Sequence, residues 1–379
     1  MTPDNIYLDF AATTPLDRRV GKVMSPFWTE CFANPSSVHR LGQVARRAVE
    51  DSRENVLRAI GALGGQVVFT SGATEANNLA IRSVMHQGPP GRVLTTKLEH
   101  PSVLEATRQL KNKGFQLDYV KPDSTGTITA EAVQRALKPD TSLVALMYVN
   151  SETGVVTDIA KISEITRKQG ILLFCDAVQA FGSLDLNVVE LGVDILSLSG
   201  HKIYGPKGVG VLYFREDVEI DPILFGGSQE QGIRPGTINT PAVVGMGSAA
   251  LFASQDVHSE ADKIRRLRDR FENNVSKAVS PVINGRGGVR SPKHSNLYFR
   301  NVDGQSLLMN LDLEGISASI GSACSAGSFK PSQVLTDMGM TPDEAMSSVR
   351  FSFGRGITEV DVDRAVERVV TAVNRSKSG

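Results

Sequence analysis

The feature that most constrains the fold of this chain is a regular alternation of short apolar runs with helical segments. Apolar runs separated in this way indicate parallel strands whose two faces are both covered by helices. We therefore predict an α/β fold with a mostly parallel sheet. The expected strands are residues 67–70, 93–95, 117–120, 143–149, 171–176, 194–199 and 209–214, and the expected helices are residues 43–60, 74–85, 101–111, 129–137 and 159–168.

A second, smaller unit is expected in the last third of the chain, where this alternation stops. With 379 residues the chain is too long for one ordinary domain. We predict a large domain over residues 15–255 and a smaller α+β domain over residues 256–379, which also takes in residues 1–14. The elements expected in the smaller domain are a charged helix at 261–279, a strand at 296–299, and helices near 306–313 and 359–373.

Charge and hydropathy argue against several classes of protein. Acidic and basic residues number 41 each, so bulk charge gives no reason to expect direct binding of nucleic acid or a membrane surface. No apolar run is long enough for a transmembrane helix, and the N-terminus lacks the features of a signal peptide. The three cysteines lack metal-ligand spacing, so we expect a cytoplasmic protein without a metal site.

A lysine and an aspartate lie at the ends of two predicted strands. Lys202 follows one of these strands, and Asp176 ends the preceding one. A lysine amine can form a Schiff base with an aldehyde, and a carboxylate can pair with a pyridinium nitrogen. Either residue alone could be an ordinary surface group. Together they are what pyridoxal 5'-phosphate requires of a protein, so we predict this cofactor.

The segment at residues 70–75, Thr-Ser-Gly-Ala-Thr-Glu, joins a predicted strand to a helix. Its small residues would let backbone N–H groups at the helix start reach a phosphate, although a simple capped helix would look similar. Ser199 and His201 flank Lys202 and could donate to the same phosphate.

Three other polar residues stand at or just beyond predicted strand ends. His100 could stack on a pyridine ring and transfer protons, or could serve only as a helix cap. Asn150 and Gln179 could form hydrogen bonds with the substrate carboxylate and with the ring oxygen of the cofactor.

Cys324 lies in the run Gly-Ser-Ala-Cys-Ser-Ala-Gly-Ser at residues 321–328, in which every neighbour is small. A thiolate on such a loop could approach a substrate and withdraw, although an incidental cysteine would fit as well. Cys175 lies in an apolar strand, which predicts a buried and unreactive side chain. Cys31 has no evident partner.

Arg350 lies in an alternating segment, residues 347–354, that predicts a strand of the smaller domain. Its guanidinium group is suited to bind an amino-acid carboxylate with two hydrogen bonds. A surface salt bridge is the alternative role.

Taken together, these motifs resemble the cysteine desulfurases of the class V aminotransferase group, in its NifS/IscS-like branch. The resemblance implies the fold-type-I architecture of pyridoxal-phosphate enzymes and a homodimer. It also implies conversion of L-cysteine to L-alanine, with the sulfur passing to an enzyme cysteine as a persulfide. The segments that carry the resemblance are residues 7–15, 34–37, 70–75, 99–100, 149–154, 176–179, 199–202, 232–237 and 321–324.

The resemblance also implies roles for single residues. Lys202 would be the Schiff-base lysine, Cys324 the persulfide carrier, and His100 the residue that stacks on the cofactor and aids proton transfer. Asp176 would pair with the pyridinium nitrogen and Gln179 with the ring oxygen. The phosphate would be held by Ala73, Thr74, Ser199 and His201, with Thr237 reaching it from the other subunit, and the substrate would be oriented by Asn34, Asn150 and Arg350.

The sulfur acceptor is left open by the sequence. An acceptor protein of iron–sulfur cluster assembly, of tRNA thiolation or of DNA sulfur modification would each fit. Gln231 and Lys330 replace residues that are commonly arginine and acidic in the family, which could alter the dimer face or the acceptor surface. A pyridoxal-phosphate aminotransferase or lyase would share Lys202 and Asp176 but would have no need of Cys324. A non-catalytic binding protein on a decayed fold would not need to keep all of these reactive groups.

Overall fold

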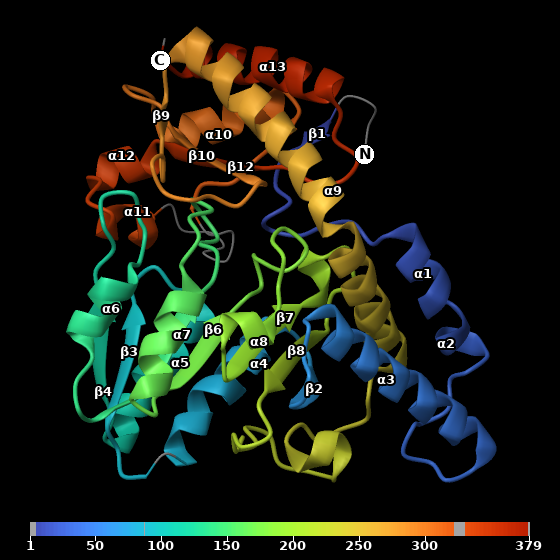
Figure 1. Ribbon diagram of the computed structural model, residues 1–379. Helices are drawn as coiled ribbons and strands as arrows, with labels where there is room; N and C mark the ends of the chain where they lie inside the picture. Colours follow the sequence, from blue (N-terminus) through green and yellow to red (C-terminus); the bar gives the residue numbers. More distant parts are fainter. Residues whose placement is uncertain (1–4, 87, 322–329, 378–379) are drawn as a thin grey trace.

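A seven-stranded sheet forms the centre of the larger of two lobes in the computed structural model, which describes residues 5–86, 88–321 and 330–377 (Figure 1). The strand order is β2-β8-β7-β6-β5-β3-β4, and β8 alone runs antiparallel to its neighbours. The prediction of a mostly parallel sheet is confirmed. The strands are β2 (Gln66–Thr70), β3 (Arg92–Thr96), β4 (Gln116–Val120), β5 (Thr141–Met147), β6 (Leu172–Asp176), β7 (Ile195–Ser199) and β8 (Gly210–Phe214).

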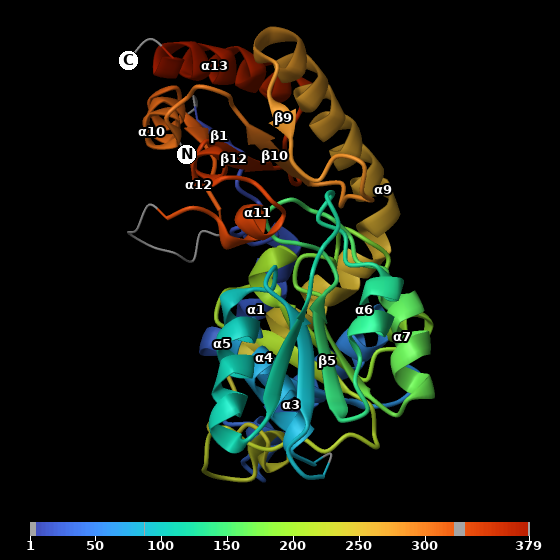
Figure 2. The same ribbon diagram turned by 90° about the vertical axis from the view of Figure 1, so that its left-hand side faces the viewer.

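Helices cover both faces of this sheet, which explains why its strands read as continuous apolar runs. Buried side chains of α4 and α5 pack on one face, and those of α3, α6, α7 and the first half of α9 pack on the other. Figure 2 shows β5 between α5 on one side and α6 and α7 on the other. The helices of this lobe are α1 (Arg18–Met24), α2 (Pro26–Thr29), α3 (Arg40–Ala59), α4 (Ala73–Arg82), α5 (Pro101–Leu110), α6 (Ala130–Ala136), α7 (Ile159–Lys168) and α8 (Val188–Leu191), with 3-10 turns η1 (Ser83–His86), η2 (Lys111–Lys113), η3 (Gly200–Lys202) and η4 (Gln229–Gly232).

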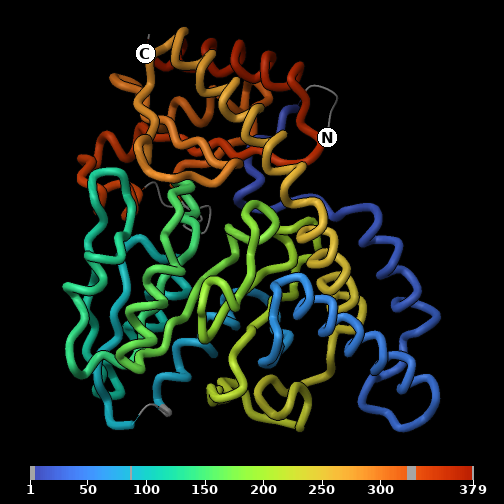
Figure 3. Tube along the Cα trace, viewed as in Figure 1, coloured from blue at the N-terminus to red at the C-terminus, as the bar shows by residue number. Residues whose placement is uncertain are grey.

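The smaller lobe is built around an antiparallel sheet of order β12-β10-β9. The start of the chain joins it, because β1 pairs with β11 and because Ile6, Leu8 and Phe10 belong to the same apolar core as α13 (Figure 3). The division into domains at residue 255 stays a prediction. The elements are β1 (Ile6–Tyr7), β9 (Val282–Ile283), β10 (His294–Tyr298), β11 (Ile316–Ser317), β12 (Ser348–Ser352), α10 (Gly304–Leu313), α11 (Gln333–Asp337), α12 (Pro342–Met346) and α13 (Glu359–Lys377).

The helix that links the two lobes is longer than the sequence suggested. We expected it to begin at residue 261, but α9 runs for 40 residues from Thr240 to Val279, so the expected start was wrong. Glycines in the first half of α9 weaken the helical signal in the sequence, because glycine disfavours helix by about 1 kcal/mol relative to alanine. Gly247 is required by packing, since a side chain there would begin 2.7 Å from the Ser52 Cα. Within the described ranges, no helix is both long and apolar enough to cross a membrane.

Phe271 on α9 tests how far the smaller lobe depends on its aromatic core. Its buried ring lies 5.0 Å from that of Phe351 and 5.4 Å from that of Phe353, measured between centroids. Phe271→Ala should lower the free energy of unfolding by about 3–5 kcal/mol, because the removed ring leaves a cavity. Urea unfolding followed by circular dichroism measures this loss. Leu313→Ala, at a position that is 76% exposed in the same lobe, should change stability by less than about 0.5 kcal/mol. Equal losses in the two variants would contradict the prediction.

Candidate active site

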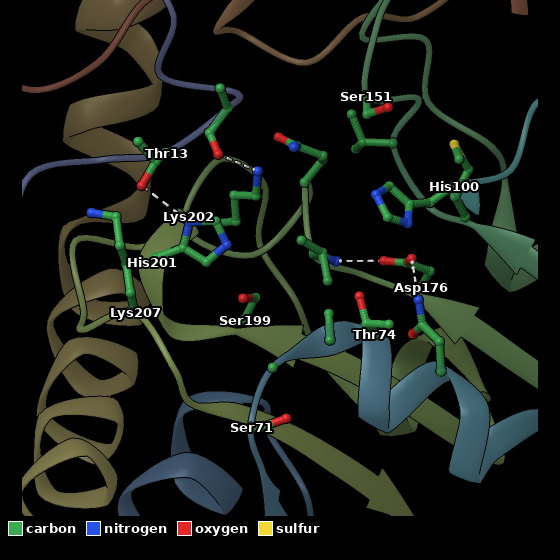
Figure 4. A pocket seen from close by; sticks show the side chains of 18 of the residues that line it. Thr13, Ser71, Thr74, His100, Ser151, Asp176, Ser199, His201, Lys202 and Lys207 are labelled. Carbon is green, nitrogen blue, oxygen red and sulfur yellow. Dashed lines mark hydrogen bonds between the residues drawn. The ribbon is translucent and has the colours of Figure 1, made fainter. Parts of the chain in front are cut away.

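A cavity of about 470 Å³ opens at the carboxyl ends of the parallel strands (Figure 4). Met147, Asp176 and Ser199, each the last residue of its strand, all line it. Met147 on β5 is in register with Asp176 on β6, and Asp176 is in register with Ser197 on β7, which continues to Ser199. Carboxyl ends of parallel strands are the usual place for a ligand in such sheets. The sequence-predicted residues that line the cavity are Ala73, Thr74, His100, Asp176, Gln179, Ser199, His201 and Lys202.

Lys202 is placed by the turn η3 between β7 and β8. Its Nζ donates hydrogen bonds to the backbone oxygens of Ala11, at 2.7 Å, and Ala12, at 2.6 Å. The turn continues through Tyr204, whose positive φ of 63° is unusual for a residue with a side chain. The Tyr204 N–H donates to Thr14 Oγ1 over 2.8 Å, which holds this conformation. The lysine is therefore positioned jointly by its own turn and by the N-terminal segment.

Asp176 lies at the floor of the cavity and is 6% exposed. Its carboxylate accepts hydrogen bonds from the Val178 N–H, at 3.1 Å, and from Asn77 Nδ2, at 3.0 Å. Burial raises the pKa of Asp176, while nearby His100, these two hydrogen bonds and Lys202 lower it. Because burial wins, a cation bound in the cavity would stabilise the carboxylate further.

A relay of hydrogen bonds connects Asp176 with His100. Asn77 Nδ2 lies 2.8 Å from Ser102 Oγ, which in turn lies 2.7 Å from His100 Nδ1. His100 Nδ1 also accepts the Ser102 N–H and so caps α5. Because Nδ1 accepts this N–H, the neutral form of the ring has its proton on Nε2. His100 thus combines the two roles that the sequence left open, a helix cap and a ring at the cavity wall.

The end of the cavity opposite Asp176 is suited to bind an anion. The helix α4 begins there at Ala73, and its N-cap Gly72 has no side chain to occupy the first N–H groups. Such a helix start attracts negative charge. A side chain on Gly210 of β8 would begin 2.5 Å from the Gly72 carbonyl carbon, so glycine is needed for this close approach. Lys207 lines the same cavity, although no motif in the sequence indicated this position.

His201 also lies at this end, where its Nδ1 is 3.1 Å from Thr13 Oγ1. Burial, together with the positive charges of Lys202 and Lys207, lowers the pKa of His201 to about 4. The ring is therefore neutral at physiological pH and can donate one hydrogen bond to a phosphate without adding charge.

Gln179 supplies a further observation about the ligand. Its Nε2 donates to the Ala11 carbonyl over 2.9 Å, whereas its buried Oε1 has no hydrogen-bond partner among the described residues. A buried polar atom that lines a cavity and lacks a partner indicates a polar group on the ligand. An amine at Lys202, a carboxylate at Asp176 and an anion site at α4 around one cavity fit pyridoxal 5'-phosphate.

The remaining predicted residues lie outside the cavity lining. Asn150 is buried beside it, and its Oδ1 accepts the N–H groups of Glu152, at 3.0 Å, and Thr153, at 2.9 Å. Asn34 and Thr237 are exposed. Gln231 and Lys330, the two positions that differ from the residues common in the family, are exposed as well. Cys324 falls outside the described residues.

Arg350 is almost completely buried on β12 of the smaller lobe, at 2% exposed. Its Nη2 donates to Asp9 Oδ1 over 2.8 Å, and its Nη1 donates to the Ser151 carbonyl over 2.9 Å. The alternative of a surface salt bridge is wrong, because the pair is internal. Ser151 lines the cavity, so Arg350 lies directly behind the cavity wall.

Comparisons with known proteins agree on one family. A family model described as "Aminotransferase class-V" matches residues 6–365. The cysteine desulfurase IscS of Pseudomonas entomophila is 44% identical over 381 residues, which cover 98% of this chain and 93% of the relative. A solved NifS-like protein is 32% identical with a TM-score of 0.91, covering 98% of this chain and all of the other. A structure of SspA in complex with cysteine is 35% identical with a TM-score of 0.82, covering 92% of this chain and 98% of the other.

The lowered pKa of His201 predicts a pH dependence of stability in the cofactor-free protein. The unfolded state takes up the histidine proton near pH 6.5, whereas the folded state does so only near 4. Between these values the unfolded state binds more protons, so the free energy of unfolding falls as the pH falls. His201→Gln should lose less stability than the wild type between about pH 7 and about pH 5. Urea unfolding at the two pH values gives this difference, and equal losses would show that His201 is not the group responsible.

Proposed function

The chain belongs to the class-V aminotransferase family and is a pyridoxal-phosphate-dependent cysteine desulfurase, and from that premise we propose which of its residues do the work. The family resemblance found in the sequence is confirmed by the family model and by the curated relatives. The observation that carries the residue assignments is the convergence of Lys202, Asp176 and the start of α4 on one cavity. The reaction converts L-cysteine to L-alanine and delivers sulfur to an enzyme cysteine.

Lys202 would hold the cofactor through its aldehyde, and Asp176 would hold the pyridine nitrogen in its protonated form. When bound, the cofactor withdraws electrons from the substrate Cα and makes its proton acidic. The Nζ of Lys202 then accepts this proton from Cα and later donates it back to the bound molecule. His100, whose orientation Ser102 fixes, assists at the cavity wall. Acid–base groups of this kind typically contribute about 10²–10⁴-fold in rate.

The phosphate would be bound by the N–H groups at the start of α4, where Ala73 and Thr74 lie, and by the hydroxyl of Ser199. His201 adds a neutral donor, because its pKa of about 4 keeps it uncharged. Gln179 would meet the ring oxygen of the cofactor. These assignments agree with the cavity lining.

Substrate binding would depend on the smaller lobe. Arg350 provides the positive charge for the substrate carboxylate, and its buried Nε has no hydrogen-bond partner among the described residues. Asn150 would contribute both to substrate and to cofactor binding by shaping the turn that carries Ser151. Asn34 is a further proposed contact of the carboxylate.

We propose that the protein is a homodimer. Large apolar side chains are exposed around α2 and the start of α3, including Trp28 at 61%, Phe32 at 70% and Val38 at 84%, and Phe225 is 88% exposed. Exposed apolar groups of this size mark surfaces that bind other proteins. A second copy that covers them would also bring its Thr237 toward the phosphate of the first subunit.

Cys324 would receive the sulfur. Its thiolate forms an S–S bond to the substrate sulfur as the C–S bond breaks, and the released electron pair stays with the carbon skeleton. That skeleton takes up a proton and leaves as L-alanine, so L-cysteine and a thiol give L-alanine and a persulfide without an added oxidant. Cys175 is unsuited to this role, because complete burial raises the pKa of its thiol well above the ordinary value.

The persulfide sulfur would then pass to an acceptor protein. The three acceptor systems of iron–sulfur cluster assembly, tRNA thiolation and DNA sulfur modification remain alternatives. The cytosol keeps free thiols reduced, so we propose a cytoplasmic location for a protein whose reaction needs one.

Lys202→Ala tests the covalent attachment of the cofactor. Reduction of the wild-type holoenzyme with borohydride should leave the cofactor permanently on the protein, as seen by intact-protein mass spectrometry. Lys202→Ala should lack this adduct and lose at least about 10²-fold in alanine formation. Lys207→Met, which changes a second lysine of the same cavity, should keep the adduct. An adduct retained in Lys202→Ala would show that another residue holds the aldehyde.

Cys324→Ser tests the sulfur acceptor. This variant should keep its cofactor and still change its absorbance when L-cysteine is added, because binding does not need the thiol. It should form neither L-alanine nor protein-bound sulfur, since a hydroxyl is not ionised at neutral pH. Cys31→Ser and Cys175→Ser are the controls and should remain active. Undiminished alanine formation by Cys324→Ser, or first sulfur found on Cys31 or Cys175, would refute the assignment.

A further inference from the structure

The turn at residues 150–154 contains a buried carboxylate whose role the reaction described above does not explain. Glu152 is 4% exposed, and its Oε2 accepts a hydrogen bond of 2.5 Å from the hydroxyl of Ser332. Ser332 itself is 6% exposed. Short O–H···O contacts are typical of hydrogen bonds to an ionised carboxylate, which are about twice as strong as neutral ones. The pair is therefore a firm connection between the larger lobe and the segment that begins α11.

Gly321 and Ser332, which flank the segment that carries Cys324, both lie close to the Glu152 carboxylate. Gly321 precedes the segment, and a side chain at that position would begin 3.9 Å from Glu152 Oε2. Gly321 has a φ of 63°, a conformation that favours glycine. Ser332 follows the segment and is bonded to the same oxygen. Gly321 and Ser332, which flank the sequence around Cys324, therefore both lie beside a single side chain.

The turn itself is held in place from several directions, so Glu152 is a fixed point. The Glu152 carbonyl accepts a hydrogen bond from Asn296 of β10 over 3.3 Å. Gly154 packs so closely on His294 that a side chain there would begin 2.5 Å from the His294 Cβ. Ser151, one residue before Glu152, lines the cavity. A group that binds the Glu152 side chain is therefore held in a fixed position relative to the bound substrate.

The N-terminal end of the segment has its own attachment. Ser319 Oγ donates to Asp9 Oδ2 over 2.8 Å, and the backbone of Ser319 exchanges two hydrogen bonds with Arg350. Asp9 in turn binds Arg350 through its other oxygen. This end is therefore anchored independently, whereas the other end is held by the Glu152–Ser332 pair together with Val334, which is buried in the apolar core of the larger lobe.

We propose that Glu152 is a positioning residue for sulfur transfer, which acts by fixing the position of Ser332, a residue that follows Cys324 closely in the sequence. This inference rests on the proposed function of Cys324 as the sulfur acceptor. The proposal assigns Glu152 to the sulfur-transfer step and not to cofactor binding or to the steps before it. Displacement of a reacting group by about 1 Å can cost 10²-fold in rate, so a distant anchor can have a large effect.

Ser332 has a second role that the test must separate from the first. Its hydroxyl oxygen also accepts the Leu335 N–H over 3.1 Å and so caps α11. Ser332→Asp keeps an acceptor suited to this cap but places a second carboxylate against Glu152. In the double variant Glu152→Gln/Ser332→Asp, the glutamine amide can donate to the new carboxylate and restore the connection. Thr341→Ala, which removes the cap of α12, controls for loss of a helix cap in the same lobe.

Two measurements on the holoenzyme separate the halves of the reaction. The rate of the absorbance change on adding L-cysteine reports binding and the first steps, and single-turnover formation of alanine and persulfide reports sulfur transfer. Ser332→Asp should keep the first rate and slow the second about 10–100-fold. The double variant should recover to within about threefold of wild type, and Thr341→Ala should change neither rate. Ser332→Ala, which adds no charge, should show a smaller loss of the same kind and serves if Ser332→Asp does not fold.

A third measurement needs no turnover. Iodoacetamide alkylation of Cys324, followed by mass spectrometry of its peptide, should differ in rate from wild type in Ser332→Asp and return in the double variant. The inference would be overturned if Ser332→Asp showed wild-type rates in all three measurements. It would also be overturned if this variant slowed both halves of the reaction equally and the double variant did not recover. Failure of the proposed function has a different signature, which is alanine formation by Cys324→Ser whatever the behaviour of the Ser332 variants.

Discussion

The buried carboxylate of Asp176 is the constraint on which the rest of the site depends. A carboxylate withdrawn from water needs hydrogen bonds and an opposite charge to remain ionised. Asn77 and the Val178 N–H supply hydrogen bonds, yet burial still raises the pKa of Asp176. The nearby charges of His100 and Lys202 lower this pKa only in part, so a further cation in the cavity would stabilise the carboxylate. The protein therefore favours a pyridine ring that is protonated, which is the form that withdraws electrons best.

The reactive lysine depends on the packing between the lobes. Phe10 belongs to the core of the smaller lobe, and Gly354 leaves room for its ring, which a side chain at that position would overlap. The next two residues, Ala11 and Ala12, offer the carbonyl oxygens that receive the Lys202 amine. Residues 10–12 therefore both pack in the smaller lobe and accept the hydrogen bonds of Lys202. A shift of the smaller lobe would move the groups around Lys202 as well.

Much of the site could be predicted from the sequence because its motifs are local. Lys202 and Asp176 stand at strand ends, and parallel strands bring such ends to one edge of a sheet. The relay from Asn77 through Ser102 had no such signal, since each residue is an ordinary polar position within a helix. The pairing of Arg350 with Asp9 and that of Glu152 with Ser332 join residues far apart in the chain. The start of α9 was missed because its glycines, of which Gly247 is required by the packing against α3, are typical of a loop.

The electrostatics of the larger lobe also bear on which thiol can accept sulfur. Cys175 precedes Asp176, and burial together with the charges of Asp176 and Glu99 raises the pKa of its thiol. A thiol at that position stays protonated and inert, so it does not compete for the cofactor aldehyde or for the substrate sulfur. The negative charge that secures the cofactor thus suppresses thiolate formation around it. A reactive thiol has to come from outside this core, and the proposed acceptor Cys324 belongs to the sequence between Ser319 and Ser332, whose side chains bind Asp9 and Glu152.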